Sequence, residues 1–486
     1  MNKAKNLLIV MNDEHSRKAL GCYGHPFVRT PNLDKLAGRG MQFNNAYSAS
    51  PICVPARGAI ATGRYVHEIG CWDNANAYDG TIPSWHHLLR EQGHEVISIG
   101  KLHFQREGQD HGFDREIVPM HLAEGRGALI SLLRDPTIKR GTSSALADTA
   151  GPGESAYTRY DREISAHAQV WLRETAPTLG PKPWALFVSF VAPHFPLTCP
   201  PEFYYQYPLD RIDVPKLHGR QVEHVHPYVK GLWSYHRHAD FFKDDMHVRK
   251  AIAAYYGLCT FIDGEIGKVL GALDSAGLAD ETRVIYTSDH GDNLGTRGLW
   301  GKNTMYEESV GVPLIVAGPD VPHGVCDTPV SHIDMYPYIL ESVGAQPDDA
   351  VRPGVSLSDI WAGRKAPPFA FSEYHASGSV DGVFMIRTQR YKYIFHVALL
   401  AELYDLERDP EELDNLAENP DYVGVVAELK AMLFTLCDPF EVDRAAKRRQ
   451  AELIEQNGGR EAVLSRGDFG NTPAPGTKVV YEKTQG

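Results

Sequence analysis

Short, largely apolar segments recur along this chain of 486 residues, and each is followed within a few residues by polar side chains. The segments cover residues 7–11, 96–99, 184–191, 283–287 and 313–316. Apolar runs of this length without alternation are typical of strands that are buried on both faces of a parallel sheet. Because helical patterns separate them, the sequence predicts an α/β fold with a large mixed, mostly parallel sheet sandwiched by helices.

Side chains that can bind ligands or transfer protons follow most of these predicted strands. The carboxyl ends of parallel strands meet at one edge of a sheet, where ligands bind in open α/β folds, so these side chains are expected to lie together. Viewed singly, Asp13 would serve equally well as a cap or turn residue, and Lys101 as a solvated strand end. The full set is Asp13, Glu14, Lys101, His103, His194, Asp289 and His290.

One segment combines a cysteine, a proline and an arginine, in the order Ser-Pro-Ile-Cys-Val-Pro-Ala-Arg-Gly from Ser50 to Gly58. Pro55 suits the first turn of a helix, so the segment predicts a loop that delivers Cys53 to a helix N-terminus. Free N–H groups there favour an anion, and Arg57, one turn on, can fork onto an oxyanion. A free cysteine is also among the residues most often buried in a core, so the motif alone leaves both interpretations open.

Composition excludes several classes of partner and location. With 49 Lys and Arg against 62 Asp and Glu, the net charge of −13 argues against nucleic acid and anionic membranes, although a local basic pocket is compatible with it. No apolar run reaches the length of a membrane span, and the first lacks the length and cleavage site of a signal peptide. The seven cysteines are scattered and never form a CxxC pair, as expected of reduced thiols. We therefore expect a cytoplasmic protein.

The pattern of elements divides the chain into three parts. Residues 1–365 predict the main domain, with insertions at about 121–158 and 197–247; residues 366–439 predict a small α+β subdomain, and residues 440–486 a C-terminal arm or tail. The first insertion has little periodicity and is expected at the surface. The second is rich in aromatic residues and histidines, lacks zinc-type spacing, and is expected to form a packed loop and the substrate wall.

Taken together, the motifs resemble those of a known family. The chain is similar along most of its length to the sulfatase family of the alkaline phosphatase superfamily, nearest to the branch of choline sulfatases and phosphonate monoester hydrolases. Each matching segment lies at a predicted strand or helix terminus, so the ordered set is far more specific than any one motif. The segments are residues 6–13, 53–64, 100–103, 191–196, 287–291, Lys302 and 403–417.

The resemblance implies that residues 1–365 form the catalytic domain and that Cys53 is oxidised to formylglycine (3-oxoalanine) by a formylglycine-generating enzyme. The hydrated aldehyde would be the nucleophile. A plain serine or cysteine attacking a sulfate ester would leave a stable covalent adduct, whereas the second hydroxyl of a gem-diol allows sulfate to be expelled and the aldehyde to be restored.

The resemblance also assigns roles to the surrounding polar residues. Arg57 would support the formylglycine, and His194 would act as the base for its second hydroxyl. Lys101 and Lys302 would bind the sulfate oxygens and offset charge that builds in the transition state. Two further residues complete the implied set: His103 would protonate the leaving alkoxide or hydrogen-bond the sulfate, and Asn74 would make a polar contact near the nucleophile.

One divalent metal is implied, with Asp13, Asp289, His290 and the modified Cys53 as ligands. The most familiar site of the family is all-oxygen, with asparagine where His290 stands and aspartate where Glu14 stands. Because a nitrogen ligand moves the preference from Ca²⁺ toward Mn²⁺, both metals remain candidates. Glu14 is either a further ligand or faces away.

The implied activity is that of a sulfuric ester hydrolase that cleaves a small organic sulfate monoester. The alternative is a phosphonate monoester or phosphodiester hydrolase with the same nucleophile, but that branch usually lacks the segment Gly100-Lys101-Leu102-His103. A third interpretation is an unmodified relative that only binds anions. Choline-O-sulfate is a narrower hypothesis, because aromatic residues at 203–242 would form a cage for its quaternary ammonium. A homo-oligomer is also expected, with the segment from residue 440 onward packed on a neighbouring subunit.

Overall fold

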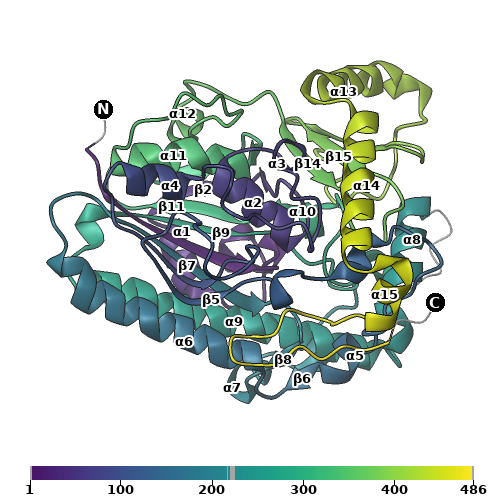
Figure 1. Ribbon diagram of the computed structural model, residues 1–486, viewed down its shortest axis with the longest axis horizontal. Coiled ribbons are helices and arrows are strands. Elements are labelled where there is room, and N and C mark those ends of the chain that lie inside the picture. Colours follow the sequence, from purple (N-terminus) through teal and green to yellow (C-terminus); the bar gives the residue numbers. More distant parts are fainter. Residues whose placement is uncertain (1–2, 216, 219–224, 484–486) are drawn as a thin grey trace.

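The computed structural model describes residues 3–215, 217–218 and 225–483, so part of the predicted insertion at 197–247 lies outside the described residues (Figure 1). Its centre is an eight-stranded sheet in the order β12-β2-β11-β9-β1-β7-β4-β5. The strands from β9 to β5 run parallel, whereas β11 runs antiparallel to both of its neighbours. The predicted mixed, mostly parallel sheet is confirmed. The strands are β1 (Asn6–Asp13), β2 (Gly40–Phe43), β4 (Val96–Lys101), β5 (Arg115–Met120), β7 (Ala185–Pro193), β9 (Thr282–Ser288), β11 (Leu314–Ala317) and β12 (Gly324–Cys326).

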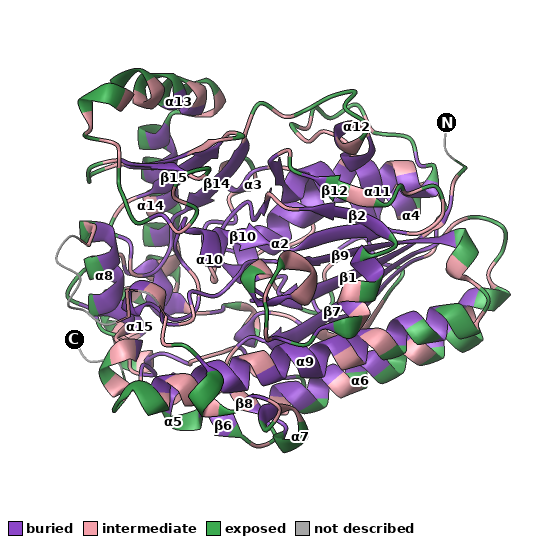
Figure 2. Cartoon of the chain, turned by 180° about the vertical axis from the view of Figure 1, so that it is seen from behind, coloured by how far each residue is buried: buried purple, intermediate pink, exposed green. Residues whose placement is uncertain are grey.

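Strand β1 explains why helices must cover both faces of this sheet. Successive side chains of a strand point to opposite faces, so Leu8 and Val10 pack into one core while Leu7 and Ile9 pack into the other. In Figure 1, α6 and α9 run below the sheet and α4 and α11 lie above it; Figure 2 shows their buried sides turned toward the strands. The first core includes α1 (Pro31–Ala37), α6 (Ala156–Val170) and α9 (Asp245–Ser275), and the second includes α2 (Cys53–Thr62), α4 (Trp85–Glu91) and α11 (Met335–Val343).

A second, smaller sheet follows in the C-terminal part of the chain. It is antiparallel, has the order β14-β15-β16-β17, and carries α13 (Val423–Leu436) against β15 and β16. This antiparallel subdomain agrees with the predicted α+β character, whereas the domain boundaries stay predictions. The strands are β14 (Ala370–Tyr374), β15 (Val383–Arg387), β16 (Tyr391–His396) and β17 (Glu402–Asp405).

The insertion at 121–158 and the C-terminal arm pack on one another. Leu129, Ile130 and Leu132 are buried in one cluster with Val463 of α15 (Gly459–Arg466). The expectation of an insertion confined to the surface is therefore wrong. Its apolar residues lack helical or strand periodicity, and only contacts from a distant part of the chain bury them.

The C-terminal arm folds back along its own chain. Helix α14 (Pro439–Gln456) precedes α15, and the segment after α15 returns through an isolated bridge between Asp468 and Glu482. Phe469 and Ala474 of this returning segment are buried. The homo-oligomer remains a prediction. Among the described helices, none combines the length and the apolar character that a membrane crossing requires.

Gly100 provides a test of how tightly the edge of the sheet is packed before Lys101. It has a φ of +100°, and a Cβ atom there would lie 2.2 Å from the carbonyl oxygen of Ser189. We expect Gly100→Ala to lower the free energy of unfolding by about 3 kcal/mol, because backbone strain and overpacking add. Urea denaturation would measure the loss.

Gly108 is the matched control for this substitution. Its φ is +82°, but a Cβ atom there would have nothing within 4 Å. Gly108→Ala therefore retains the backbone strain without the clash, and we expect it to cost about 1 kcal/mol. Equal losses for the two variants would contradict the close approach of the strands.

Candidate active site

Four neighbouring strands, β9, β1, β7 and β4, end at the same edge of the sheet. Asp289 follows β9, Asp13 ends β1, and Lys101 ends β4. His194 comes directly after β7. All four side chains are buried, so the strand order gathers residues that are far apart in the sequence into one interior group.

Cys53 reaches this group from α2, where it is the first helical residue and Pro55 lies in the first turn, as predicted. Its Sγ lies 3.2 Å from Nε2 of His290 and 3.1 Å from Nζ of Lys302. Burial, followed by the charge of Asp13, raises the pKa of the Cys53 thiol to about 11. The unmodified side chain therefore keeps its proton at neutral pH, in spite of the helix N-terminus.

The four predicted metal ligands come together. Nδ1 of His290 lies 3.0 Å from the carbonyl oxygen of Gly291, which can only accept, so the ring proton is on Nδ1 and Nε2 carries a lone pair. Nε2 faces Oδ1 of Asp289 at 3.6 Å and Oδ1 of Asp13 at 3.8 Å, in addition to Cys53. All four ligand atoms lie within 4.8 Å of one another and are buried. Converging lone pairs of oxygen, nitrogen and sulfur fit a divalent cation.

Arg57 holds the two carboxylates of this group from behind. Its Nε donates to Oδ2 of Asp289 at 2.8 Å, and Nη2 donates to Oδ2 of Asp13 at 3.0 Å. Nη1 donates to the carbonyl oxygen of Lys101 at 2.7 Å and to Oγ of Ser189 at 3.0 Å. The guanidinium is therefore engaged by the protein. Its position on the helix had suggested that it forks onto a substrate oxyanion, but its nitrogens instead bind groups of the protein. The reason is that two buried carboxylates require a counter-charge.

Asp13 and Glu14 are adjacent but electrostatically different. Burial raises the pKa of Asp13, but Lys101, whose Nζ lies 2.5 Å away, and Arg57 outweigh it and hold the pKa well below its usual value. Burial raises the pKa of Glu14 well above its usual value, although Lys302 opposes it. Glu14 does not face away from the site: its Oε2 lies 3.3 Å from Lys302 Nζ and from His194 Nε2, beside the four-ligand group.

His194 is held as a proton acceptor. Its Nδ1 lies 2.6 Å from the carbonyl oxygen of Phe195, so this nitrogen carries the proton. Nε2 accepts a hydrogen bond of 2.7 Å from Nζ of Lys302, which also contacts Cys53. Burial, and then the charge of Lys302, lower the pKa of His194 well below its usual value, so the ring is neutral.

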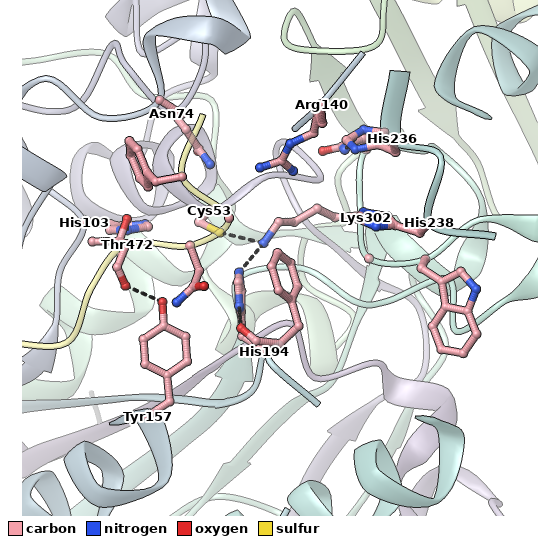
Figure 3. A pocket seen from close by; sticks show the side chains of 18 of the residues that line it. Cys53, Asn74, His103, Arg140, Tyr157, His194, His236, His238, Lys302 and Thr472 are labelled. Atoms are coloured by element: carbon pink, nitrogen blue, oxygen red, sulfur yellow. Dashed lines mark hydrogen bonds between the residues drawn. The ribbon is translucent and has the colours of Figure 1, made fainter. Parts of the chain in front are cut away.

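The other two predicted residues line the cavity above Cys53 (Figure 3). Asn74 accepts a hydrogen bond from the backbone N–H of Val54 at 3.2 Å, which places its amide at the start of α2. Nε2 of His103 pairs with Oγ1 of Thr472 at 2.8 Å. All the predicted site residues thus lie in one connected group.

The returning C-terminal segment is the part of the site that sequence reasoning missed. Phe469, Asn471 and Thr472 line the cavity, and the hydroxyl of Tyr157 donates to the carbonyl oxygen of Thr472 at 2.5 Å. The Gly and Pro content of this segment predicted an arm or frayed end. Its sequence carries no signal that would place it in the site, because its position depends on contacts more than 300 residues away.

The aromatic insertion contributes less to the cavity than expected. His236 and His238 line it, but none of the described aromatic residues of 203–242 does. Tyr207 and Trp233 are buried in the core, and Phe242 stacks on Trp300 at 4.5 Å. The predicted aromatic cage is therefore wrong, because these rings serve packing.

Two protein families match parts of this sequence, and known relatives match most of it. The family described as "Sulfatase" matches residues 5–345, and "N-sulphoglucosamine sulphohydrolase, C-terminal" matches residues 295–438. A choline-sulfatase of Rhizobium meliloti (strain 1021) is 31% identical over 424 residues, 85% of this chain and 83% of the relative. An uncharacterized sulfatase of Escherichia coli (strain K12) is 28% identical over 446 residues, 90% and 88% of the two chains.

Two solved structures share the fold. The phosphonate monoester hydrolase of Agrobacterium radiobacter has a TM-score of 0.71 at 22% identity, covering 89% of this chain and 95% of its own. A 2-O GAG sulfatase has a TM-score of 0.73 at 23% identity, covering 97% and 99%. The predicted family resemblance is confirmed.

Arg57 is expected to be essential for stability. Arg57→Gln leaves two buried carboxylates without their shared counter-charge, and we expect a loss of about 3–5 kcal/mol in the free energy of unfolding. Arg64→Gln is the matched control, since its pair with Glu68 is 3.8 Å long and partly exposed; it should cost less than about 1 kcal/mol. Urea denaturation of both variants would measure this, and similar losses would contradict the assigned role.

Proposed function

The chain belongs to the sulfatase family, and on that premise we propose that it hydrolyses a small organic sulfate monoester to an alcohol and sulfate. The reaction is R–O–SO₃⁻ + H₂O → R–OH + SO₄²⁻ + H⁺. The observation that carries the proposal is the position of Cys53, with lone-pair donors on one side and Lys302 on the other.

We propose that Cys53 is converted to formylglycine by a formylglycine-generating enzyme. Its hydrate supplies two hydroxyls on one carbon, one to attack the sulfate ester and one whose deprotonation releases sulfate. The raised pKa of the Cys53 thiol supports this proposal, because the unmodified side chain is a poor nucleophile at neutral pH.

His194 and the two lysines would act on either side of the nucleophile. The lone pair on Nε2 of His194, which accepts a hydrogen bond from Lys302 in the free protein, would take a proton from a hydroxyl at position 53, while Phe195 fixes the other ring nitrogen. The ammonium groups of Lys101 and Lys302 offset the negative charge that builds on the sulfate oxygens. Lys101 is buried and the Lys302 side chain is 10% exposed, and both are held by contacts within the protein, so they would be oriented before the substrate arrives.

His103 would give a proton to the leaving oxygen, and Asn74 would add a polar contact near the nucleophile. Burial, and then Lys101 and Arg57, lower the pKa of His103, so the ring is neutral in the free protein. A bound sulfate ester brings negative charge close to the ring and favours its protonated form. The hydrogen bond between Nε2 of His103 and the hydroxyl of Thr472, which can either donate or accept, would keep the ring in place through this change.

Asp13, Asp289, His290 and the residue at position 53 would hold one divalent metal. When bound, the metal would polarise the sulfate and lower the pKa of the nucleophilic hydroxyl. The nitrogen donor supports Mn²⁺ over Ca²⁺. Glu14, which contacts Lys302 and His194, would set their charge rather than complete the metal site.

A kinetic comparison tests the activity. Enzyme co-expressed with a formylglycine-generating enzyme, with conversion at Cys53 verified by mass spectrometry, should give a larger kcat/KM for 4-nitrophenyl sulfate than for a phenyl phosphonate monoester. Cys53→Ala should abolish both. A larger value for the phosphonate would favour the phosphonate hydrolase, which shares the fold. An intact thiol in protein from the native host would favour the anion-binding alternative.

The choice of metal depends on His290. Protein stripped of metal and offered equal Mn²⁺ and Ca²⁺ should retain Mn²⁺, and His290→Asn should shift the bound ratio toward Ca²⁺ by about tenfold or more. Elemental analysis by mass spectrometry measures the ratio without recourse to activity. His332→Asn is the control, because His332 is buried nearby but donates to the carbonyl oxygen of Ser288. Retention of Ca²⁺ by the unchanged protein would contradict the preference.

A further inference from the structure

The cavity contains a cation that the proposed hydrolysis does not use. Arg140, from the insertion at 121–158, lines it together with Asn74, Lys302 and Asn303, and Figure 3 shows its guanidinium turned toward the space beside Lys302. Nε of Arg140 donates to Oδ2 of Asp468 at 2.8 Å. Within the described ranges, neither terminal nitrogen of Arg140 has a hydrogen-bond partner.

The arginine is positioned by the protein and remains accessible. Its side chain is 15% exposed, whereas Asp468 behind it is wholly buried and also accepts a hydrogen bond of 3.0 Å from Oγ1 of Thr142. The backbone N–H of Arg140 donates to the carbonyl oxygen of Tyr235 at 3.0 Å. A guanidinium held through Nε presents its two terminal nitrogens as a fork.

The lining of the cavity is rich in cations although the chain carries a net charge of −13. Lys101, Arg140 and Lys302 line it, and no carboxylate does so among the described residues. His236 and His238 lie beside Arg140; burial lowers the pKa of both, to about 4 for His238, so neither adds charge. Asp13, Glu14 and Asp468 pair with these three cations from outside the lining, so the groups that face the cavity itself are the cationic ones.

We propose that Arg140 binds a second anionic group on the leaving alcohol, so that the preferred substrates are sulfate esters that also carry a carboxylate or a further sulfate. This inference rests on the proposed function and names its substrate class. The planar fork matches two oxygens of either anion. A trimethylammonium group would instead enter a cavity lined by three cations and, among the described residues, by no carboxylate.

A set of esters that differ mainly in charge tests the proposal. The sulfate esters of 4-hydroxybutanoate, of choline and of 3,3-dimethylbutanol, which is the uncharged isostere of choline, supply an anion, a cation and a neutral group. Butane-1,4-diol bis-sulfate separates a second sulfate from a carboxylate. With verified formylglycine enzyme, we expect kcat/KM for the anionic esters to exceed that for the neutral ester by about tenfold or more, and choline-O-sulfate to rank last.

Substitution of the arginine should remove this preference. Arg140→Gln should lower kcat/KM for the anionic esters by about 10- to 100-fold and change the neutral ester by less than about threefold. Lys139→Gln is the matched control: it removes the same charge at the exposed neighbouring position and should change none of the values. If Arg140→Gln alone unfolds because Asp468 is left unpaired, Arg140→Gln with Asp468→Asn removes both partners.

Calorimetric binding to Cys53→Ala, which cannot be converted, separates the subsite from the reaction. The anionic esters should bind at least about tenfold more tightly to Cys53→Ala than to the same protein with Arg140→Gln. Binding or turnover that is indifferent to Arg140→Gln, or a preference for choline-O-sulfate, would overturn the subsite while leaving the proposed function standing. Conversely, tight Arg140-dependent binding without hydrolysis of any sulfate ester, 4-nitrophenyl sulfate included, would overturn the proposed function alone.

Discussion

The shared ion pair of Arg57 with Asp13 and Asp289 is the interaction on which the site depends. Both carboxylates are fully buried at the ends of neighbouring strands, where unpaired charges would be strongly unfavourable. Arg57 lies on α2, one turn after Cys53. The pairing that neutralises the strand ends therefore also docks the helix, and the docked helix sets where Cys53 meets the proposed metal ligands. Fold stability and catalytic geometry have the same electrostatic origin.

The same constraint explains the chemistry expected at position 53. A helix N-terminus favours an anion by about 0.3–1 kcal/mol, and on that basis alone a thiolate would be expected. Burial dominates instead, and the two carboxylates add to it, so that the pKa of the Cys53 thiol rises to about 11. The same carboxylates favour a cation, which in turn would favour an ionised hydroxyl at this place. The environment is thus poorly suited to a cysteine nucleophile and well suited to a metal with a modified residue.

The predictable part of the structure is the part that local patterns determine. Asp13, Lys101, His194 and Asp289 each end or follow a largely apolar strand, and because these strands end at one edge of the sheet, the pattern alone predicts that the four side chains lie together. The start of α2 at Cys53 was predictable from Pro55. The short strands β2, β5 and β12 were missed, because strands of three to six residues at or next to the edge of a sheet leave little pattern. The partners of Arg57 were also missed, since the motif shows where an arginine lies but not which charges surround it.

Arg140 and Thr472 could not be found from the sequence for a different reason. They lie in segments without periodicity, and both are placed by contacts between the insertion at 121–158 and the returning C-terminal segment. Asp468 and Thr472 are four residues apart in this segment. Asp468 orients Arg140, and Thr472 pairs with His103. One short stretch therefore contacts both the residue proposed to select the leaving group and the residue proposed to protonate it. Because the central sheet does not specify that stretch, changes there can alter substrate selection while the metal ligands and the nucleophile stay in place.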